Sequence, residues 1–286
     1  MTAFFGFSAF ARRVPTRQAD LMPYVDTRGV SAYYDVTGEG EPVVFLHGGF
    51  CSAEVMRTLS EQLRGYAVLA PERPAHGRTP DRPGPFHYAD GVADTVVVLD
   101  ALGWDSVHVL GFSDGAAVGL LLALEHPGRV RSLVHISGNI STGADVYRAA
   151  DDPTVTLPEE QWDRIAAENA RLSPHAAENA ADISQRITQM WETEPNIDPA
   201  ALAELSMPVL VMAGDSDVIA LEHTTLIHRS IPQSRLAIVP ASTHMLVRER
   251  PALIGLMLQE FFDGVEATAR SADRPADRPA DRPLEV

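Results

Sequence analysis

One short segment carries the residue types of a nucleophile: Gly111-Phe112-Ser113-Asp114-Gly115 fits the pattern Gly-x-Ser-x-Gly. It follows the apolar run VHVL and precedes the small-residue run AAVGLLLAL, which predicts a strand, a tight turn and a helix. A serine in such an elbow occupies a strained turn, and the residues two before and two after it must lack bulk. Both positions hold glycine. We therefore predict that Ser113 is a nucleophile, with an incidental serine in a glycine-rich turn as the alternative.

A serine hydroxyl is a weak nucleophile until a base takes its proton and a carboxylate fixes the tautomer of that base. His244 follows the apolar run RLAIVP, and Asp217 follows the apolar run PVLVMAG. Loops at the carboxyl ends of parallel strands converge, so we predict His244 as the general base and Asp217 as its orienting carboxylate. Asp215 is the less favoured alternative, because the residue directly after a strand commonly turns the chain.

Attack on a carbonyl also needs donors for the oxyanion, and backbone N–H groups can supply them. The segment His47-Gly48-Gly49-Phe50 follows the first core strand. We assign the two donors to the N–H groups of Gly49 and Asp114, with Phe50 as the alternative to Gly49. His47 is expected to hold this loop by hydrogen bonding rather than to act as an acid or base.

These residues can meet only if the elements that carry them form one sheet. Six short apolar runs predict strands at residues 43–49, 66–72, 107–113, 130–137, 208–214 and 235–240. Most are continuous rather than alternating, which is typical of strands buried on both faces of a parallel sheet. Helix-prone segments at residues 54–64, 88–102, 115–126, 222–229 and 251–262 alternate with them. We therefore predict an α/β fold with a doubly wound, mostly parallel sheet and an antiparallel hairpin at its edge.

The interval 138–206 breaks this alternation, because it is polar, Ala-rich and helix-prone and contains Trp162 and Trp191. We interpret it as a helical cap over the carboxyl ends of the strands, where open α/β sheets bind ligands. The core then comprises residues 22–137 and 207–264. Phe50, Asp114, Trp162 and Trp191 are candidate substrate contacts, although the cap tryptophans could equally pack the cap onto the core. Residues 1–21 and 265–286, the latter with an ADRP repeat, are expected to be disordered.

The composition of the chain argues against some classes of partner. The chain of 286 residues has 23 Lys and Arg against 39 Asp and Glu, a formal net charge of −16, so it lacks a field that attracts nucleic acid or anionic membrane. Its one cysteine, Cys51, cannot form an internal disulfide. The N-terminal apolar residues precede the basic ones, the wrong order for a secretion signal. We expect a cytoplasmic protein, monomeric or homodimeric, with a small-molecule substrate.

No motif supports a cofactor. The sequence contains no HExxH, no paired cysteines, no P-loop and no G-x-G-x-x-G after its first strand. His223 and His228 are five residues apart, so a helix would place them on different faces. We therefore expect neither a metal nor a nucleotide cofactor.

Taken together, HGG, GFSDG, GDSD, STH and the segment APERPAHGRT resemble the α/β-hydrolase superfamily from about Pro23 to Gly264. Such families usually carry Asp-x-Arg-Gly-His-Gly-x-Ser after the second parallel strand, and this chain departs from that pattern. Because the elbow holds a serine, we do not expect this chain to belong with the relatives that use an aspartate nucleophile. The elbow is also similar to that of valacyclovir hydrolase-like esterases, whose acid after the nucleophile pairs with the substrate ammonium. Alternatively, Asp114 does not bind substrate and is a carboxylate that the helix dipole stabilises at the N-terminus of the helix.

The resemblance implies a serine hydrolase that cleaves a small-molecule ester, lactone, thioester or amide through an acyl-enzyme on Ser113. Two alternatives stay open. The same three side chains could perform perhydrolysis or cleave a carbon–carbon or carbon–nitrogen bond, because a change of cap and pocket alters the reaction without altering them. The chain could also be a ligand-binding receptor with slow turnover.

Overall fold

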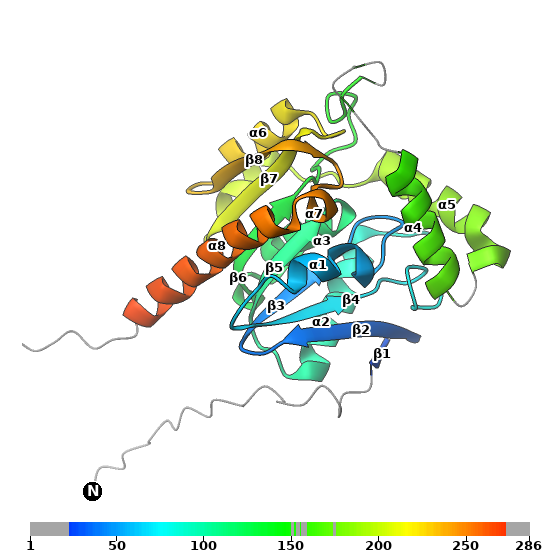
Figure 1. The fold of residues 1–286 in the computed structure, drawn as a ribbon, viewed down its shortest axis with the longest axis horizontal. Helices are drawn as coiled ribbons and strands as arrows, with labels where there is room; N and C mark the ends of the chain where they lie inside the picture. Colours follow the sequence, from blue (N-terminus) through cyan, green and yellow to red (C-terminus); the bar gives the residue numbers. More distant parts are fainter. Residues whose placement is uncertain (1–22, 150–151, 153–154, 156–158, 174–175, 273–286) are drawn as a thin grey trace, which may run out of the picture.

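The computed structural model describes residues 23–149, 152, 155, 159–173 and 176–272 (Figure 1). Within them, eight strands form one sheet in the order β1-β2-β4-β3-β5-β6-β7-β8. The strands are β1 (Tyr24–Thr27), β2 (Val30–Gly38), β3 (Glu41–Leu46), β4 (Tyr66–Pro71), β5 (Val107–Phe112), β6 (Val130–Ile136), β7 (Val209–Ser216) and β8 (Arg235–Thr243). Only the pairs β1·β2 and β2·β4 are antiparallel. The predicted mostly parallel α/β sheet with an antiparallel edge is confirmed.

The continuous apolar runs are explained by burial on both faces of the sheet. In β3, Val43 and Phe45 lie in one core cluster, whereas Val44 and Leu46 lie in the other. Side chains of a strand alternate between faces, so most positions of a strand that is covered on both sides are apolar.

Helices cover each face of this sheet. One cluster receives side chains from α2 (Tyr88–Leu102), α3 (Asp114–Glu125) and α6 (Leu221–Ser230). The other receives them from the short helices η2 (Ala53–Met56), α1 (Arg57–Ser60) and α7 (Leu246–Glu249) and from α8 (Pro251–Ala272). The fold is therefore doubly wound, as the sequence predicts.

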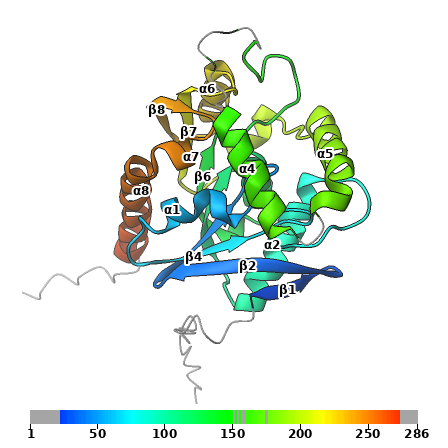
Figure 2. The same cartoon turned by 45° about the vertical axis from the view of Figure 1, so that its right-hand side comes forward.

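The interval between β6 and β7 contains α4 (Glu159–Leu172), α5 (Ala176–Thr193) and η4 (Pro199–Glu204). In Figure 1, α4 and α5 stand together at one side of the molecule, away from α1, α6 and α8, and in Figure 2 α4 crosses in front of the sheet. In contrast, Leu202 and Leu205 are buried in the core cluster with Val209 and Ile227. The end of the interval is thus part of the core layer, and the two helices that stand over the sheet occupy only residues 159–193.

The C-terminal boundary also differs from the expectation, since α8 continues through Ala272 rather than ending near Gly264. The reason is a buried polar cluster that the apolar pattern does not show. Glu266, on the last turns of α8, accepts hydrogen bonds from His108 Nε2 at 3.0 Å and from Arg131 Nη1 at 3.2 Å. The expected disordered residues 1–21, and the repeat from residue 273 onward, lie outside the described residues.

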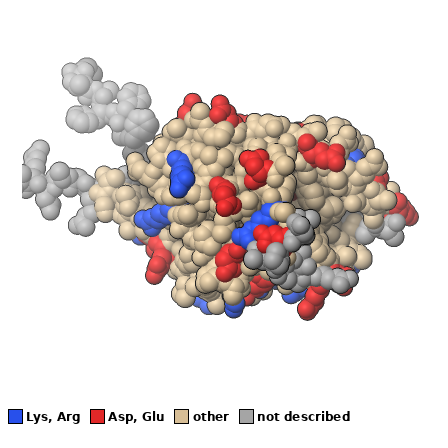
Figure 3. Space-filling view, turned by 90° about the horizontal axis from the view of Figure 1, so that it is seen from above, with Lys and Arg blue, Asp and Glu red and all other residues tan. Residues whose placement is uncertain are grey.

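The surface offers no single charged patch on the face seen from above, where acidic and basic side chains are scattered among uncharged ones (Figure 3). Across the described ranges, none of the helices is both long enough and apolar enough to cross a membrane.

Candidate active site

Ser113 occupies a strained turn between β5 and α3. Its backbone has φ 55° and ψ −121°, in the left-handed region of φ that a residue with a Cβ rarely adopts. A Cβ at Gly111 would lie 2.1 Å from Gly115 O, and a Cβ at Gly115 would lie 2.0 Å from Leu46 O. Both glycines are therefore required by close backbone approach, which is the physical content of the Gly-x-Ser-x-Gly pattern.

Two loops bring the expected partners to Ser113. His244 directly follows β8, and its Nε2 lies 3.0 Å from Ser113 Oγ. Asp217 directly follows β7, and its Oδ1 lies 2.8 Å from His244 Nδ1. Because the carboxylate can only accept, Nδ1 carries the proton and Nε2 accepts from the serine hydroxyl. The arrangement can therefore remove the proton of Ser113 as the hydroxyl attacks.

Asp217 is fully buried yet held in its charged form. Burial would raise its pKa, but His244, the hydroxyl of Ser137 and the N–H of Ile219 outweigh burial and leave the pKa below its ordinary value. For His244 burial would lower the pKa, but the Asp217 carboxylate outweighs it and raises the pKa above 6.5. Both shifts share one cause, the attraction between imidazolium and carboxylate, to which the hydrogen bonds from Ser137 and Ile219 add at Asp217.

The other candidate carboxylate has a different task. Asp215 accepts hydrogen bonds from the backbone N–H groups of Ala241, at 2.9 Å, and of Ser242, at 3.0 Å. Those bonds, the Ser242 bond first, lower its pKa. Asp215 thus joins the ends of β7 and β8, while Asp217 is the carboxylate that lies against His244.

The loop after β3 faces the elbow. A Cβ at Gly48 would lie 3.0 Å from the Cβ of Ser113. His47 accepts a hydrogen bond from Arg73 N at Nε2, 3.1 Å away, so its Nδ1 donates to Gly48 O at 2.8 Å. Burial keeps the pKa of His47 well below 6.5, and the neutral ring fixes the loop. Gly49 and Asp114 lie against each other beside Ser113, and their N–H groups stay the predicted oxyanion donors.

Asp114 has its partners inside the fold. Its Oδ1 accepts from Tyr88 OH at 3.0 Å and from Trp191 Nε1 at 2.8 Å, and its Oδ2 pairs with Arg73 Nη2 at 3.3 Å. The side chain is only 5% exposed. A substrate ammonium would have to compete with Arg73 for this carboxylate. The arrangement therefore favours a positioning role over the hypothesis that Asp114 binds an amine.

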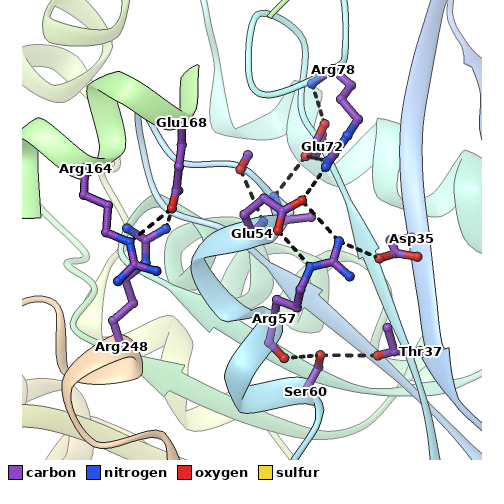
Figure 4. Close-up of polar contacts among 12 residues, drawn as sticks. Asp35, Thr37, Glu54, Arg57, Ser60, Glu72, Arg78, Arg164, Glu168 and Arg248 are labelled. Atoms are coloured by element: carbon purple, nitrogen blue, oxygen red, sulfur yellow. Dashed lines mark hydrogen bonds and ion pairs between the residues drawn. The ribbon is translucent and has the colours of Figure 1, made fainter. Parts of the chain in front are cut away.

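The loop after β4, which carries Arg73, is tied to the loop after β3 by a buried acid (Figure 4). Glu72 accepts from Ala53 N at 3.1 Å and from Arg78 Nη1 at 2.7 Å. Arg78 also pairs with Glu54, a second bond between the two loops. A Cβ at Gly77, where φ is 53°, would lie 2.4 Å from the Glu72 carboxylate. Glu72, which stands where the family pattern has aspartate, thus helps to hold the two segments together.

A cavity of about 130 Å³ lies over Ser113 and His244. Three of the four candidate substrate contacts line it, namely Asp114, Trp162 and Trp191, whereas Phe50 lines a neighbouring cavity. Other lining residues had not been foreseen: Cys51, Ser137, Asn139, Tyr147, Val218, Ile219 and Met245. Ser137 could have been found, because it ends a predicted strand at the edge where the loops converge. Tyr147 stands in the irregular part of the interval, where no pattern marks it.

The two cap helices are attached to the core in different ways. Trp191 and Glu194, at the end of α5, bind residues of the core, since Glu194 Oε2 accepts from Tyr88 N at 3.0 Å. On α4, Glu168 pairs with Arg248 of α7 (Figure 4).

Among the described residues there is no group of His, Cys, Asp and Glu side chains that could hold a metal.

Comparison with known proteins gives one family match, to the α/β hydrolase fold, over residues 41–188. The human serine hydrolase BPHL is 27% identical over 242 residues, covering 78% of this chain and 79% of its own. The 2-hydroxy-6-oxo-2,4-heptadienoate hydrolase of Pseudomonas putida is 29% identical, covering 70% and 74%. Among solved structures, Est816, described as an N-acyl homoserine lactone degrading enzyme, has a TM-score of 0.69 at 24% identity, covering 84% and 100%. That likeness concerns the fold alone.

Proposed function

Because the chain belongs to the α/β-hydrolase fold family, we propose that it is a serine hydrolase that forms an acyl-enzyme on Ser113. That the chain is a hydrolase follows from the family and from its named relatives. The bond cleaved is that of a small-molecule ester, lactone, thioester or amide. The observation that carries the proposal is the chain of contacts from Ser113 Oγ to His244 Nε2 and from His244 Nδ1 to Asp217.

The geometry supports a two-step reaction. His244 Nε2 takes the hydroxyl proton as Ser113 Oγ bonds to the substrate carbonyl carbon, and the N–H groups of Gly49 and Asp114 stabilise the oxyanion. The imidazolium then gives its proton to the leaving oxygen, sulfur or nitrogen as that bond breaks. In the second step His244 takes a proton from water, the hydroxide adds to the acyl carbon, and Ser113 leaves with the proton returned to it.

A second candidate reaction rests on one relative. The Pseudomonas putida protein is named for a 2-hydroxy-6-oxo-dienoate substrate, so cleavage of a carbon–carbon bond by the same three side chains is the alternative reaction. A receptor that only binds its ligand is disfavoured, because a complete base and carboxylate pair would serve no purpose there.

The test is hydrolysis of p-nitrophenyl acetate, butyrate and octanoate, with a fluorophosphonate label located by mass spectrometry. We expect the label on Ser113 and loss of turnover in Ser113→Ala. Ser230→Ala, at the end of α6, is the matched control and should keep both label and turnover. Absence of label and turnover in the wild type would favour a receptor or the carbon–carbon alternative, which a dienoate substrate would then separate.

A further inference from the structure

A second and larger cavity, of about 590 Å³, lies between the two cap helices and the loops after β3 and β4. We call it the chamber. Its lining includes Phe50, Ala75 and His76 from the loops, together with one face of α4 and one face of α5. The positions on α4 are 162, 163, 165, 166, 169 and 170, with Ser173 just past its end, and those on α5 are 180, 183 and 187. This spacing is that of single helix faces turned toward one another.

The two cavities differ in volume, and this difference indicates different functions. Pockets that enclose a small-molecule ligand usually measure roughly 300–1,000 Å³. The cavity over Ser113, at about 130 Å³, falls below this range, whereas the chamber, at about 590 Å³, falls within it. A substrate of ordinary size must therefore extend beyond the cavity over Ser113.

The chamber adjoins that cavity. Trp162 and Ile165 line both, so these two side chains of α4 form a shared wall. Beside them, the ring of Phe50, which lines the chamber, contacts the edge of Trp191, which lines the cavity over Ser113, with ring centroids 5.4 Å apart. Side chains can change rotamer readily, so rotamer changes of Trp162 and Ile165 can join the two cavities.

The chemistry of the chamber selects an apolar guest. Small and aliphatic side chains create the space, including Ala75, Ala166, Ala170, Ala180, Ile183 and Ile187. Within the described part of the chain, Asp163 is the one charged side chain in its lining, and no arginine lines it. His76 is held neutral because burial lowers its pKa to about 3. An anionic group would find no cation here, and an acid would repel it.

We infer that the chamber binds an uncharged, extended apolar arm of the substrate, such as a medium-length alkyl chain. This inference rests on the proposed function, because it assigns the substrate class of the same site. The arm would pass Trp162 and Ile165, which lie between the chamber and the cavity that holds the reacting carbonyl group.

Transfer of apolar surface from water gives the size of the effect. Each buried methylene should raise kcat/KM about fourfold, which corresponds to about 0.8 kcal/mol. We expect kcat/KM to rise at least about tenfold from butyrate to decanoate in p-nitrophenyl esters, or from butyl to decyl in alkyl acetates. The series that rises identifies the acyl or the alcohol arm. No rise in either series would overturn the inference.

Two neighbouring alanines of α5 provide a matched pair of variants. Both are exposed, but Ala180 lines the chamber and Ala181 does not. In Ala180→Phe the ring would fill part of the chamber, and the ratio of kcat/KM for the long to the short substrate should fall at least about tenfold. In Ala181→Phe this ratio should be unchanged. Equal ratios in both variants would contradict the assignment.

A binding measurement separates this inference from the proposed reaction. Decan-1-ol, titrated into Ser113→Ala by calorimetry, should bind at least about tenfold more tightly than butan-1-ol. Ala180→Phe in the same background should abolish that preference. Preference for decan-1-ol without ester turnover by the wild type would support the chamber while refuting the esterase proposal. Ester turnover with no preference for decan-1-ol would overturn the chamber alone.

Discussion

Trp191 Nε1 donates a hydrogen bond to Asp114 Oδ1 at 2.8 Å, which joins the end of α5 to the residue that follows Ser113. The N–H of Asp114 is a predicted oxyanion donor, and its carboxylate also binds Tyr88 and Arg73. The buried carboxylate of Asp114 therefore connects the cap helix α5 to the residue whose N–H is a predicted oxyanion donor. Displacing the cap would remove a partner from a group that burial makes costly to leave unpaired.

Trp191→Phe tests this connection. The variant keeps the aromatic contact with Phe50 but removes the donor to Asp114, so we expect kcat/KM for p-nitrophenyl acetate to fall about tenfold. The physical reason is that a hydrogen bond to a charged group contributes roughly 1.5–3 kcal/mol. Trp104→Phe, in the core away from the site, should leave kcat/KM unchanged relative to its folded fraction. Unchanged kinetics in Trp191→Phe would show that the bond does not position Asp114.

The pH dependence of turnover follows from His244. Its pKa is raised above 6.5 because the attraction of Asp217 outweighs burial. Only the neutral imidazole can take a proton, so kcat/KM should rise with pH through an apparent pKa above 6.5. In Asp217→Asn the midpoint should move to lower pH and kcat should fall on the order of 10⁴-fold, as in other triads. A wild-type midpoint below 6.5 would argue against His244 as the base.

Gly49→Ala tests the fit of the predicted oxyanion loop. An added Cβ would lie 2.7 Å from Asp114 Oδ2 and 2.7 Å from Trp191, so the loop must shift. Loss of one oxyanion donor costs about 10²–10³ in kcat, and we expect a fall of about 100-fold. Gly128→Ala is the control, because nothing lies within 4 Å of a Cβ there. Equal activity of the two variants would exclude a donor at Gly49.

Stability should decrease in mild acid because of His135. Its ring is buried, neither ring nitrogen has a hydrogen-bond partner among the described residues, and burial lowers its pKa to about 4. Between pH 4 and 6.5 the unfolded chain therefore binds the proton that the folded chain excludes, so this stability is full above pH 6.5 and is lost as pH falls. The loss amounts to about 3 kcal/mol.

His135→Leu should reduce that loss. Urea unfolding at pH 7 and pH 4.5 measures it, and the difference in free energy of unfolding between the two pH values should be smaller in the variant. His126→Leu, at the exposed end of α3, is the control and should behave as the wild type. An identical pH difference in all three proteins would rule out His135 as a cause.

The sequence predicts Ser113, His244 and Asp217 as neighbours because each lies at or shortly after the carboxyl end of a predicted strand, and parallel strands end at one edge. It does not predict that Trp191 meets Asp114, since the direction of a cap helix depends on tertiary contacts rather than on local pattern. The extra turns of α8 escaped for a related reason. Glu266 is polar in the sequence, and its burial beside His108 depends on a contact between residues far apart in the chain.

The direct pairing of β6 with β7 has a consequence for how this protein can diversify. Leu133 pairs with Val209 in parallel register, so the sheet closes across the interval without using any residue of the cap. The entropy of closing such a loop grows only with the logarithm of its length, and doubling the length costs about 0.6 kcal/mol. Outside its buried end at Leu202 and Leu205, the interval can therefore be lengthened, shortened or exchanged for that of a relative at little cost in loop-closure entropy, provided that a partner for Asp114 is kept, while the edge that holds Ser113 keeps its register.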